Sequence, residues 1–358
     1  MESPFGVDDT SAGFGIQTSV LTKGYNGNVS WNLIGHEWAV RLLKRHIADE
    51  RVRHAYLFVG PESIGKRTLA RKFAQALSCE RADPLGELCG ECRACRLISD
   101  GTFPDLDILA PDPTIQVDDV RGLQRRLALS PYEGPWRIAL LENFHNASIS
   151  AANAMLKTLE EPPDQVVLLL TAVAQEQLLS TVVSRCEVIR LRGVASSTIL
   201  GALEDREVEA ERSQMLATLS EGRPGRAIRW ESDPDLFERR SEALNQLREA
   251  MKSDIGGRFA LAERIVGRGK LPVQRRRVRS ALEACLSIWR DLLYRGYQAE
   301  VVSRNPDLLP SFETLALPVA PEDRYGVVKA ISRTLSAVDS NANLRLAVEA
   351  LMLDLPAA

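Results

Sequence analysis

The sequence lacks the features that mark several classes of protein. Six cysteines in 358 residues are too few for a disulfide-stabilised scaffold. The formal net charge of −3 gives no overall attraction to nucleic acid or to an anionic membrane, so any DNA contact must be local or made through partners. No segment holds about 18 unbroken apolar residues, the length needed to span a membrane.

The first 28 residues also lack a recognisable targeting signal. They are rich in Gly, Ser, Thr and Asn without periodicity, and we interpret residues 1–28 as a flexible leader. No basic region followed by an apolar run occurs there, as a signal peptide would require. We therefore expect a cytoplasmic protein without membrane contact.

What the sequence does contain is the pattern of a layered α/β domain. With 45% hydrophobic and 26% charged residues, the chain is typical of soluble globular proteins of two or three domains. Helical patterns alternate with short apolar runs of strand length at 55–59, 106–110, 137–142, 166–172 and 186–191. Near-continuous apolar strands between helices predict a doubly wound α/β domain with a parallel sheet, over residues 29–195.

Beyond residue 195 the strand signals stop. Short helical patterns predict a small helical lid domain over residues 196–232. From residue 233 to 358 the pattern is long and helical with breaks that contain Gly or Pro, which predicts a third, all-helical domain.

The segment GPESIGKR has the spacing of a P-loop, whose backbone N–H groups and lysine hold nucleotide phosphates. Gly60, Gly65 and Lys66 occupy the motif positions, between an apolar run and an amphipathic helix. The next residue is Arg67, where a Ser or Thr hydroxyl would bind magnesium, and Thr68 comes one position too late. These residues leave two interpretations open: a nucleotide site, or a turn kept for its shape.

A P-loop enzyme also needs two acidic residues after a neighbouring strand, one for the magnesium shell and one to polarise water. After the apolar run at 137–142 the chain offers Glu142 followed by Asn143. An amide cannot accept a proton from water as a carboxylate does. We therefore expect no hydrolysis at this site.

Four of the six cysteines lie within 17 positions, at Cys79, Cys89, Cys92 and Cys95. Two overlapping Cys-x-x-Cys turns with a fourth thiolate favour a closed, structural Zn²⁺ site with four ligands. An iron–sulfur cluster or a redox pair would use similar residues.

Taken together, these segments resemble the clamp-loader subunits of bacterial DNA polymerase III, within the AAA+ family. The resemblance extends from about residue 31 to 355 and rests on LIGHEWAVRLLKRHI, HAYLFVGPESIGKRTLA, the four-cysteine module, GTFPDLDIL, NAMLKTLEEPP, LLSTVVSRCEVIRL and NANLRLAVEALML. The ATPase subunits of the family, gamma and tau, have Thr after the lysine and an Asp-Glu pair. The departures at Arg67, Glu142 and Asn143 point to the delta-prime branch.

The resemblance implies a largely non-hydrolysing AAA+ scaffold that works within the DNA polymerase III holoenzyme. Its partners would be the gamma/tau and delta subunits and, through the complex, the sliding clamp and primed DNA. Arg185, in a Ser-Arg-Cys motif, would act as an arginine finger on the ATP of a neighbouring gamma subunit, and Arg226 lies in the region of the family's second sensor. The C-terminal helices would form part of the oligomeric collar.

Two other functions remain open from the residues. The chain could be a catalytically active gamma/tau-like ATPase, or a zinc-dependent nucleic-acid-binding module. The basic run at 275–279 would serve the second of these, although we favour a solvated or inter-subunit helix face as its explanation.

Overall fold

The computed structural model describes residues 31–83, 85–112, 114–299, 301, 303–339 and 342–356. The leader expected at residues 1–28 lies outside these described residues. None of the helices in the described ranges combines the length and apolarity of a membrane-spanning segment.

The N-terminal half contains a five-stranded sheet in which every pairing is parallel, in the order β2-β3-β4-β1-β5. The strands are β1 Ala55–Val59, β2 Leu106–Leu109, β3 Arg137–Leu141, β4 Val166–Ala172 and β5 Glu187–Arg190. Every residue of β1, β3 and β4 is buried, as the continuous apolar runs predict for a sheet covered on both faces. β2, β3 and β5 are slightly shorter than those runs.

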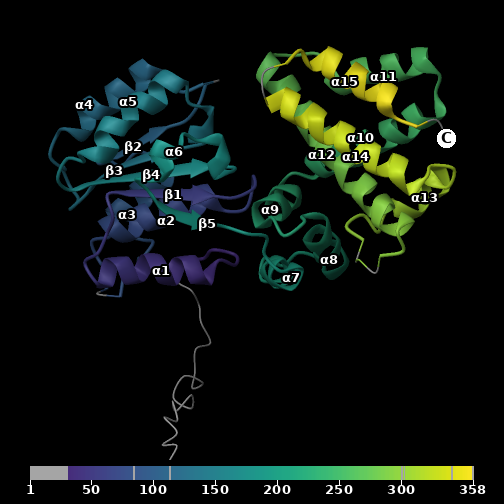
Figure 1. The fold of residues 1–358 in the computed structure, drawn as a ribbon. Helices are drawn as coiled ribbons and strands as arrows, with labels where there is room; N and C mark the ends of the chain where they lie inside the picture. Colours follow the sequence, from purple (N-terminus) through teal and green to yellow (C-terminus); the bar gives the residue numbers. More distant parts are fainter. Residues whose placement is uncertain are drawn as a thin grey trace, which may run out of the picture.

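Helices cover both faces of this sheet (Figure 1). On one face α1 Glu37–Ala48, α2 Lys66–Ser78 and α3 Arg93–Asp100 pack with Tyr56 and Phe58 of β1. On the other face α4 Val117–Leu127, α5 Ile149–Glu160 and α6 Ser180–Val183 pack with Leu57 and Val59. The alternation of side chains along a strand thus supplies two hydrophobic layers, and the predicted doubly wound P-loop fold of the AAA+ type is confirmed.

The rest of the chain is helical, apart from loops. The helices are α7 Ser196–Glu204, α8 Ala210–Leu219, α9 Pro224–Ser232, α10 Pro234–Lys252, α11 Ile255–Val266, α12 Leu271–Gly296, α13 Leu309–Ala316, α14 Pro321–Asp339 and α15 Leu344–Asp354. Proline in the first turn begins α9, α10, α12 and α13, where its missing N–H breaks no helical bond. One-turn 3-10 helices at Phe144–Asn146 and Gln175–Gln177 lie within the α/β region.

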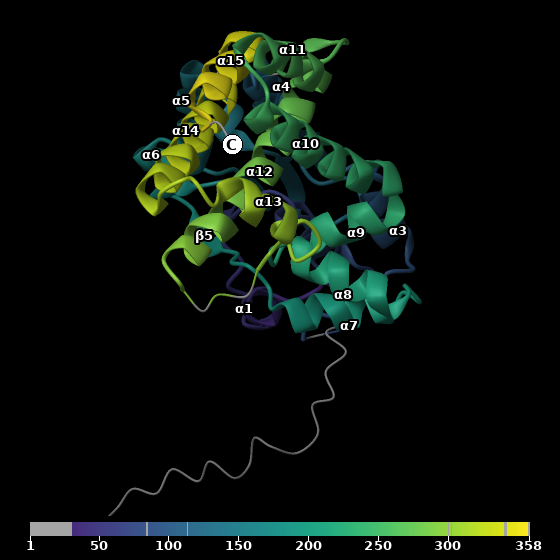
Figure 2. The same ribbon diagram turned by 90° about the vertical axis from the view of Figure 1, so that its right-hand side faces the viewer.

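Two separate hydrophobic cores stabilise the helical regions. A small core joins α7, α8 and α9 around Ile199 and Leu216, whereas a large one joins α10 to α15 around Trp289. Figure 2 shows α7 to α9 as a group beside the larger helical region. These cores support domain boundaries at 29–195, 196–232 and 233–358, which we retain as a proposal.

Asp105, just before β2, fixes the loop that leads into β3. Its buried carboxylate accepts hydrogen bonds from the backbone N–H groups of Tyr132 (2.7 Å), Glu133 (2.7 Å) and Gly134 (2.9 Å). Arg137 Nη1 lies 3.6 Å from Asp105 Oδ1. Burial by itself would raise the pKa of Asp105, but the three donors and Arg137 together hold this pKa below its ordinary value.

We expect Asp105→Asn to lower the free energy of unfolding by about 2–4 kcal/mol at pH 7, because an uncharged amide cannot replace the carboxylate toward three donors and a guanidinium. Urea denaturation followed by circular dichroism measures this. A lowered folded-state pKa stabilises above the unfolded pKa and is lost as pH falls through the folded value, so the difference from wild type should shrink only in acid.

The matched control is Asp118→Asn, since Asp118 is exposed and forms only an ion pair within its own helix. This variant should change stability by less than about 0.5 kcal/mol. Equal effects of the two substitutions would contradict the role assigned to Asp105.

Candidate functional site

The P-loop segment connects β1 to α2 at the carboxyl edge of the sheet. A side chain at Gly60 would place its Cβ 2.5 Å from the carbonyl oxygen of Leu191, so only glycine fits there. Gly65 has φ +113°, a conformation that residues with a side chain rarely adopt. The two motif glycines therefore stand where the backbone requires them.

Lys66 is folded back onto its own loop. Its buried ammonium group donates hydrogen bonds to the carbonyl oxygens of Gly60 (2.5 Å) and Pro61 (2.9 Å). Burial lowers the pKa of Lys66 to about 8, with Glu62 opposing the shift and Arg279 adding to it. Holding a phosphate would require Lys66 to exchange these carbonyl partners for phosphate oxygens.

Arg67 contacts the carboxylate of Glu142, which in a P-loop enzyme would help to hold the magnesium ion. Its Nε is 2.6 Å from Oε1 of Glu142, and Arg71 Nη2 is 4.0 Å from the same oxygen. The alignment is not that of a directed hydrogen bond, so the contact is ionic. Burial raises the pKa of Glu142, while both arginines oppose the rise. A fixed guanidinium thus supplies the positive charge that a metal ion would bring.

Asn143 and Thr68, the other two residues considered for nucleotide chemistry, are exposed. Asn143 follows Glu142 in the left-handed conformation, with φ +50°, and its backbone N–H donates to Thr171 Oγ1 at 2.8 Å. Thr68 is exposed near the start of α2, and its hydroxyl has no hydrogen bond within the described residues. The structure thus brings Gly60, Lys66 and Arg67 together at one loop, with Thr68 pointing to solvent.

Arg185 lies between α6 and β5, at the surface. Its Nη2 is 2.7 Å from Oε1 of Glu160 at the end of α5, and its Nη1 donates to the carbonyl oxygen of Thr181 at 2.8 Å. The Arg185 side chain is 34% exposed and that of Glu160 is 50% exposed. The guanidinium is therefore accessible from outside and is held by a partner that is itself solvated.

Arg226 faces the C-terminal helices. It pairs with Glu283 of α12 and with Glu221 at 3.5 Å, and its guanidinium lies 5.4 Å from the ring centre of Trp230. The same helix reaches the phosphate loop by other groups, since the N–H of Gly225 donates to the Ser63 carbonyl at 2.9 Å. Arg226 is thus an inter-domain contact here.

Sequence reasoning missed several of these partners. Arg279 of α12 lies 3.4 Å from Glu62 in the phosphate loop, and Arg229 of α9 bonds to the hydroxyl of Ser63. His145, whose Nδ1 is buried without a partner in the described structure, has a pKa lowered to about 4 by burial, Lys66 and Arg279. All three arise from contacts between distant segments, for which no local sequence signal exists.

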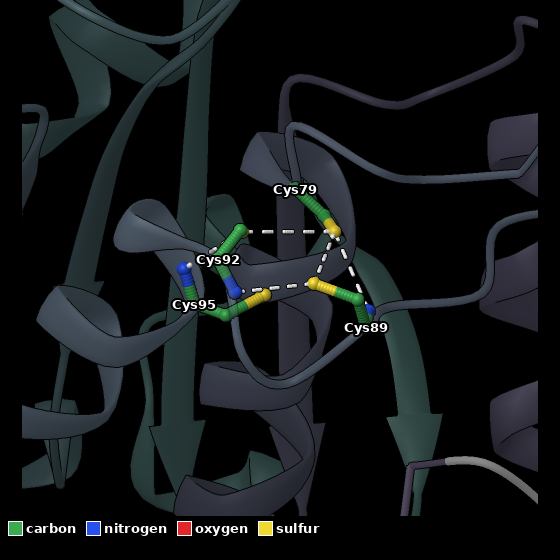
Figure 3. A group of neighbouring side chains, drawn as sticks. All are labelled: Cys79, Cys89, Cys92 and Cys95. Carbon is green, nitrogen blue, oxygen red and sulfur yellow. Dashed lines mark hydrogen bonds between the residues drawn. The ribbon is translucent and has the colours of Figure 1, made fainter.

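The four cysteines of the predicted metal site converge between α2 and α3 (Figure 3). Their sulfur atoms all lie within 4.8 Å of one another, with 3.6 Å between Cys79 and Cys89 and 3.9 Å between Cys92 and Cys79. Tetrahedral zinc with Zn–S bonds of about 2.3 Å places its ligand sulfurs about 3.8 Å apart. The cluster can therefore bind a metal ion, and all four cysteines are free of disulfide bonds.

Local backbone structure prepares these sulfurs as ligands. Cys79 ends α2, Cys92 caps α3, and the backbone N–H groups of Cys89, Cys92 and Cys95 each point at a cluster sulfur from 3.3–3.4 Å. Backbone donors lower the pKa of Cys89 to about 6, whereas burial raises the pKa of Cys79 and of Cys95. Four adjacent thiolates need a cation to balance them, which fits a metal centre.

The comparisons with known proteins point to one family of replication proteins. Residues 35–195 match the family described as "DNA polymerase III, delta subunit". The Pseudomonas aeruginosa DNA polymerase III subunit delta' is 38% identical over 56% of this chain and 62% of that protein, and the Bacillus subtilis subunit delta' is 25% identical over 88% and 94%. The Bacillus subtilis subunit tau is 32% identical over 51% of this chain.

The chain spans only part of some relatives, with 32% of that tau subunit and 62% of the Pseudomonas protein covered. Among solved structures, a Thermotoga maritima protein related to the DNA polymerase III gamma subunit aligns with 87% of this chain and 96% of its own, with 16% identity and a TM-score of 0.46. The chain has the AAA+ type of P-loop fold. Its α/β domain, over residues 35–195, matches the clamp-loader family of DNA polymerase III that includes the delta, delta-prime and tau subunits.

We expect Cys95→Ser to abolish stoichiometric metal binding and to lower the free energy of unfolding by about 3–5 kcal/mol, because three thiolates leave the tetrahedral site incomplete. Metal content by mass spectrometry and urea denaturation measure the two effects.

The control is Cys186→Ser, since Cys186 lies outside the cluster and burial alone raises its pKa, to about 12. Metal content should be unchanged in this variant. Loss of metal from both proteins, or from neither, would contradict the assignment of ligands.

Proposed function

We propose that the chain acts as a delta-prime-type subunit of the DNA polymerase III clamp loader, a scaffold that does not hydrolyse ATP itself. The observation that carries this proposal is the contact of Arg67 with Glu142, 2.6 Å between Nε and Oε1. The chain would supply an arginine finger to a neighbouring gamma/tau ATPase. Its other partners would be the delta subunit and, through the complex, the sliding clamp and primed DNA.

Hydrolysis at a P-loop needs a magnesium ion between the phosphates and the protein, and a group that orients water. Here Arg67 neutralises the carboxylate that would hold that ion, and Asn143 stands where a second carboxylate is needed. Lys66 is engaged with loop carbonyls. The site therefore lacks the metal environment, the base and a ready lysine, which supports a structural role.

Arg185 has the properties that an arginine finger needs. Its present partner is the half-exposed Glu160, and surface pairs of this kind are worth only about 0–1 kcal/mol. A triphosphate on a neighbouring subunit carries more negative charge than one carboxylate and accepts the guanidinium fork in two places. Exchange of Glu160 for a neighbour's phosphate would thus cost little.

A gamma/tau-like ATPase is the second candidate function, because Gly60, Gly65 and Lys66 are all present and a tau subunit is among the relatives. Turnover of ATP by the purified chain alone, abolished by Lys66→Ala, would favour it over the scaffold. Co-purification with the cell's own loader ATPase, followed by ATPase assays with and without this chain, tests the scaffold directly.

The metal of the four-cysteine centre would be zinc, bound structurally, because four thiolates in tetrahedral spacing leave no open position for chemistry. The centre would brace the connection between α2 and α3. One equivalent of zinc in the purified protein is the expected result, whereas the visible absorbance of an iron–sulfur cluster would overturn the assignment.

We expect Arg67→Thr to increase the affinity for ATP at least about tenfold in the presence of Mg²⁺, because it frees Glu142 and adds a hydroxyl ligand, a gain of about 1.4 kcal/mol or more. Calorimetric titration with and without EDTA measures this. Turnover should stay absent, since Asn143 is unchanged.

Arg41→Thr is the matched control, because Arg41 is an exposed arginine of α1 with no ion pair among the described residues. Its nucleotide affinity should equal that of wild type. A Mg²⁺-dependent affinity already present in wild type and unaltered by Arg67→Thr would refute the charge-replacement argument.

We expect Arg185→Ala to leave loader assembly intact and to slow ATP hydrolysis at the adjoining ATPase site by about 10³-fold or more, the usual effect of removing an arginine finger. Steady-state ATPase assays of the reconstituted complex with primed DNA measure this. Arg185→Lys should rescue only partly, because an ammonium group lacks the guanidinium fork.

Arg192→Ala serves as the control, since Arg192 is an exposed arginine just beyond the opposite end of β5. Its complex should hydrolyse ATP at the wild-type rate. Undiminished turnover in the Arg185→Ala complex would reject the finger role.

A further inference from the structure

A cavity of about 780 Å³ lies where the phosphate loop, the lid helices and the C-terminal helices meet. Its wall includes Ser63 of the loop, Trp230 of α9, Ala243 of α10 and Ala281 of α12. In Figure 1, α9 lies between the α/β domain and the C-terminal helices, at this junction. The volume falls within the range of about 300–1,000 Å³ that is typical of small-molecule sites.

The cavity is strongly basic, although the whole chain is slightly acidic. Nine arginines and four glutamates line it, and no aspartate or lysine does, which leaves a formal excess of five positive charges. Its low-dielectric walls strengthen the field of these charges. Such a concentration of one sign in a chain of net charge −3 requires either compensation within the protein or an anionic ligand.

Compensation within the protein is incomplete. Glu221 and Glu283 pair with Arg223 and Arg226 on one side of the cavity. Burial, followed by the repulsion of Arg223, lowers the pKa of Arg226 to about 10, with the two glutamates opposing the shift. At Arg226, burial and the neighbouring arginine thus outweigh the two glutamates.

Three further arginines of the lining have no such compensation. Arg239 of α10 and Arg276 and Arg277 of α12 are exposed and line the cavity. Within the described ranges none of these three forms an ion pair or a side-chain hydrogen bond. Their guanidinium groups therefore have N–H donors to offer a ligand.

We propose that this cavity binds a ligand with several linked phosphates, supplied either by a free nucleotide or by a nucleic-acid strand. Guanidinium groups on two helices would grip phosphate oxygens in pairs, and Trp230 offers an aromatic wall beside them. The ligand would join α10 to α12 and thereby stabilise the junction of the three regions.

This site is distinct from the phosphate loop. Neither Gly65 nor Lys66 lines the cavity, and only the tip of the loop, Glu62 and Ser63, reaches it. The bond from Gly225 N–H to the Ser63 carbonyl, at 2.9 Å, lies at this boundary. The proposal therefore stands whether or not the loop binds nucleotide.

The test is calorimetric titration of the full chain with sodium tripolyphosphate, with ATP in EDTA and with a ten-residue oligothymidylate. Saturable binding of at least one of these is expected, and it should weaken as salt rises. Arg276→Gln/Arg277→Gln should weaken it at least about tenfold, because two charge-assisted contacts are lost. Arg239→Gln provides an independent variant on the other helix.

The matched control is Arg41→Gln/Arg51→Gln, which removes two exposed arginines of the α/β domain that lie outside the cavity. This control should bind as wild type does. Tighter binding of tripolyphosphate and ATP identifies a free nucleotide as the source, and tighter binding of the oligonucleotide identifies a strand.

Three results would overturn the proposal. The first is no binding of any of the probes, and the second is binding that the cavity variants leave unchanged. The third is equal competition by polyglutamate, which would identify the cavity as a dock for an acidic protein segment. Unchanged circular dichroism and thermal midpoints must accompany the variants, and their exposed positions favour this.

Discussion

The buried carboxylate of Glu142 is the point on which the interior of the α/β domain depends for its electrostatic balance. It follows β3 at the carboxyl edge of the sheet, where Arg67 and Arg71 of α2 approach it. Without that negative charge, the two guanidinium groups would repel each other with no carboxylate between them. In the proposed scaffold, the Arg67–Glu142 contact would keep the shape of a nucleotide site without a bound nucleotide.

Ion pairs between arginine and glutamate also connect the proposed domains. Glu62 meets Arg279, and Glu283 meets Arg223 and Arg226, so that α12 is tied by ion pairs to both the phosphate loop and α9. In an active ATPase the lid is free to respond to the nucleotide. Here the contact of Gly225 with Ser63 and these ion pairs join α9 to the phosphate loop and to α12, which is consistent with the proposed scaffold role.

The sequence predicted the larger features because they are local. Apolar runs of strand length located the sheet, and cysteine spacing located the four-cysteine cluster, since both depend on neighbouring residues. The departures at Arg67 and Glu142 from the residues of the ATPase subunits were also visible in the sequence, but only as two separate changes. That they compensate each other depends on a contact across 75 positions, between a helix and a strand end, which no periodicity reveals. Arg226 illustrates the same limit, because its partner Glu283 belongs to another domain.

The four-cysteine cluster and the phosphate loop lie at opposite ends of one helix, α2. α2 begins at Lys66 and ends at Ser78, directly before Cys79, so its thirteen residues span about 20 Å. A helix held at both ends can neither slide nor rotate about its own axis. A bound metal would therefore help to fix how Lys66 and Arg67 are placed relative to the sheet. In this way the four-cysteine cluster would position the phosphate loop from the opposite end of α2.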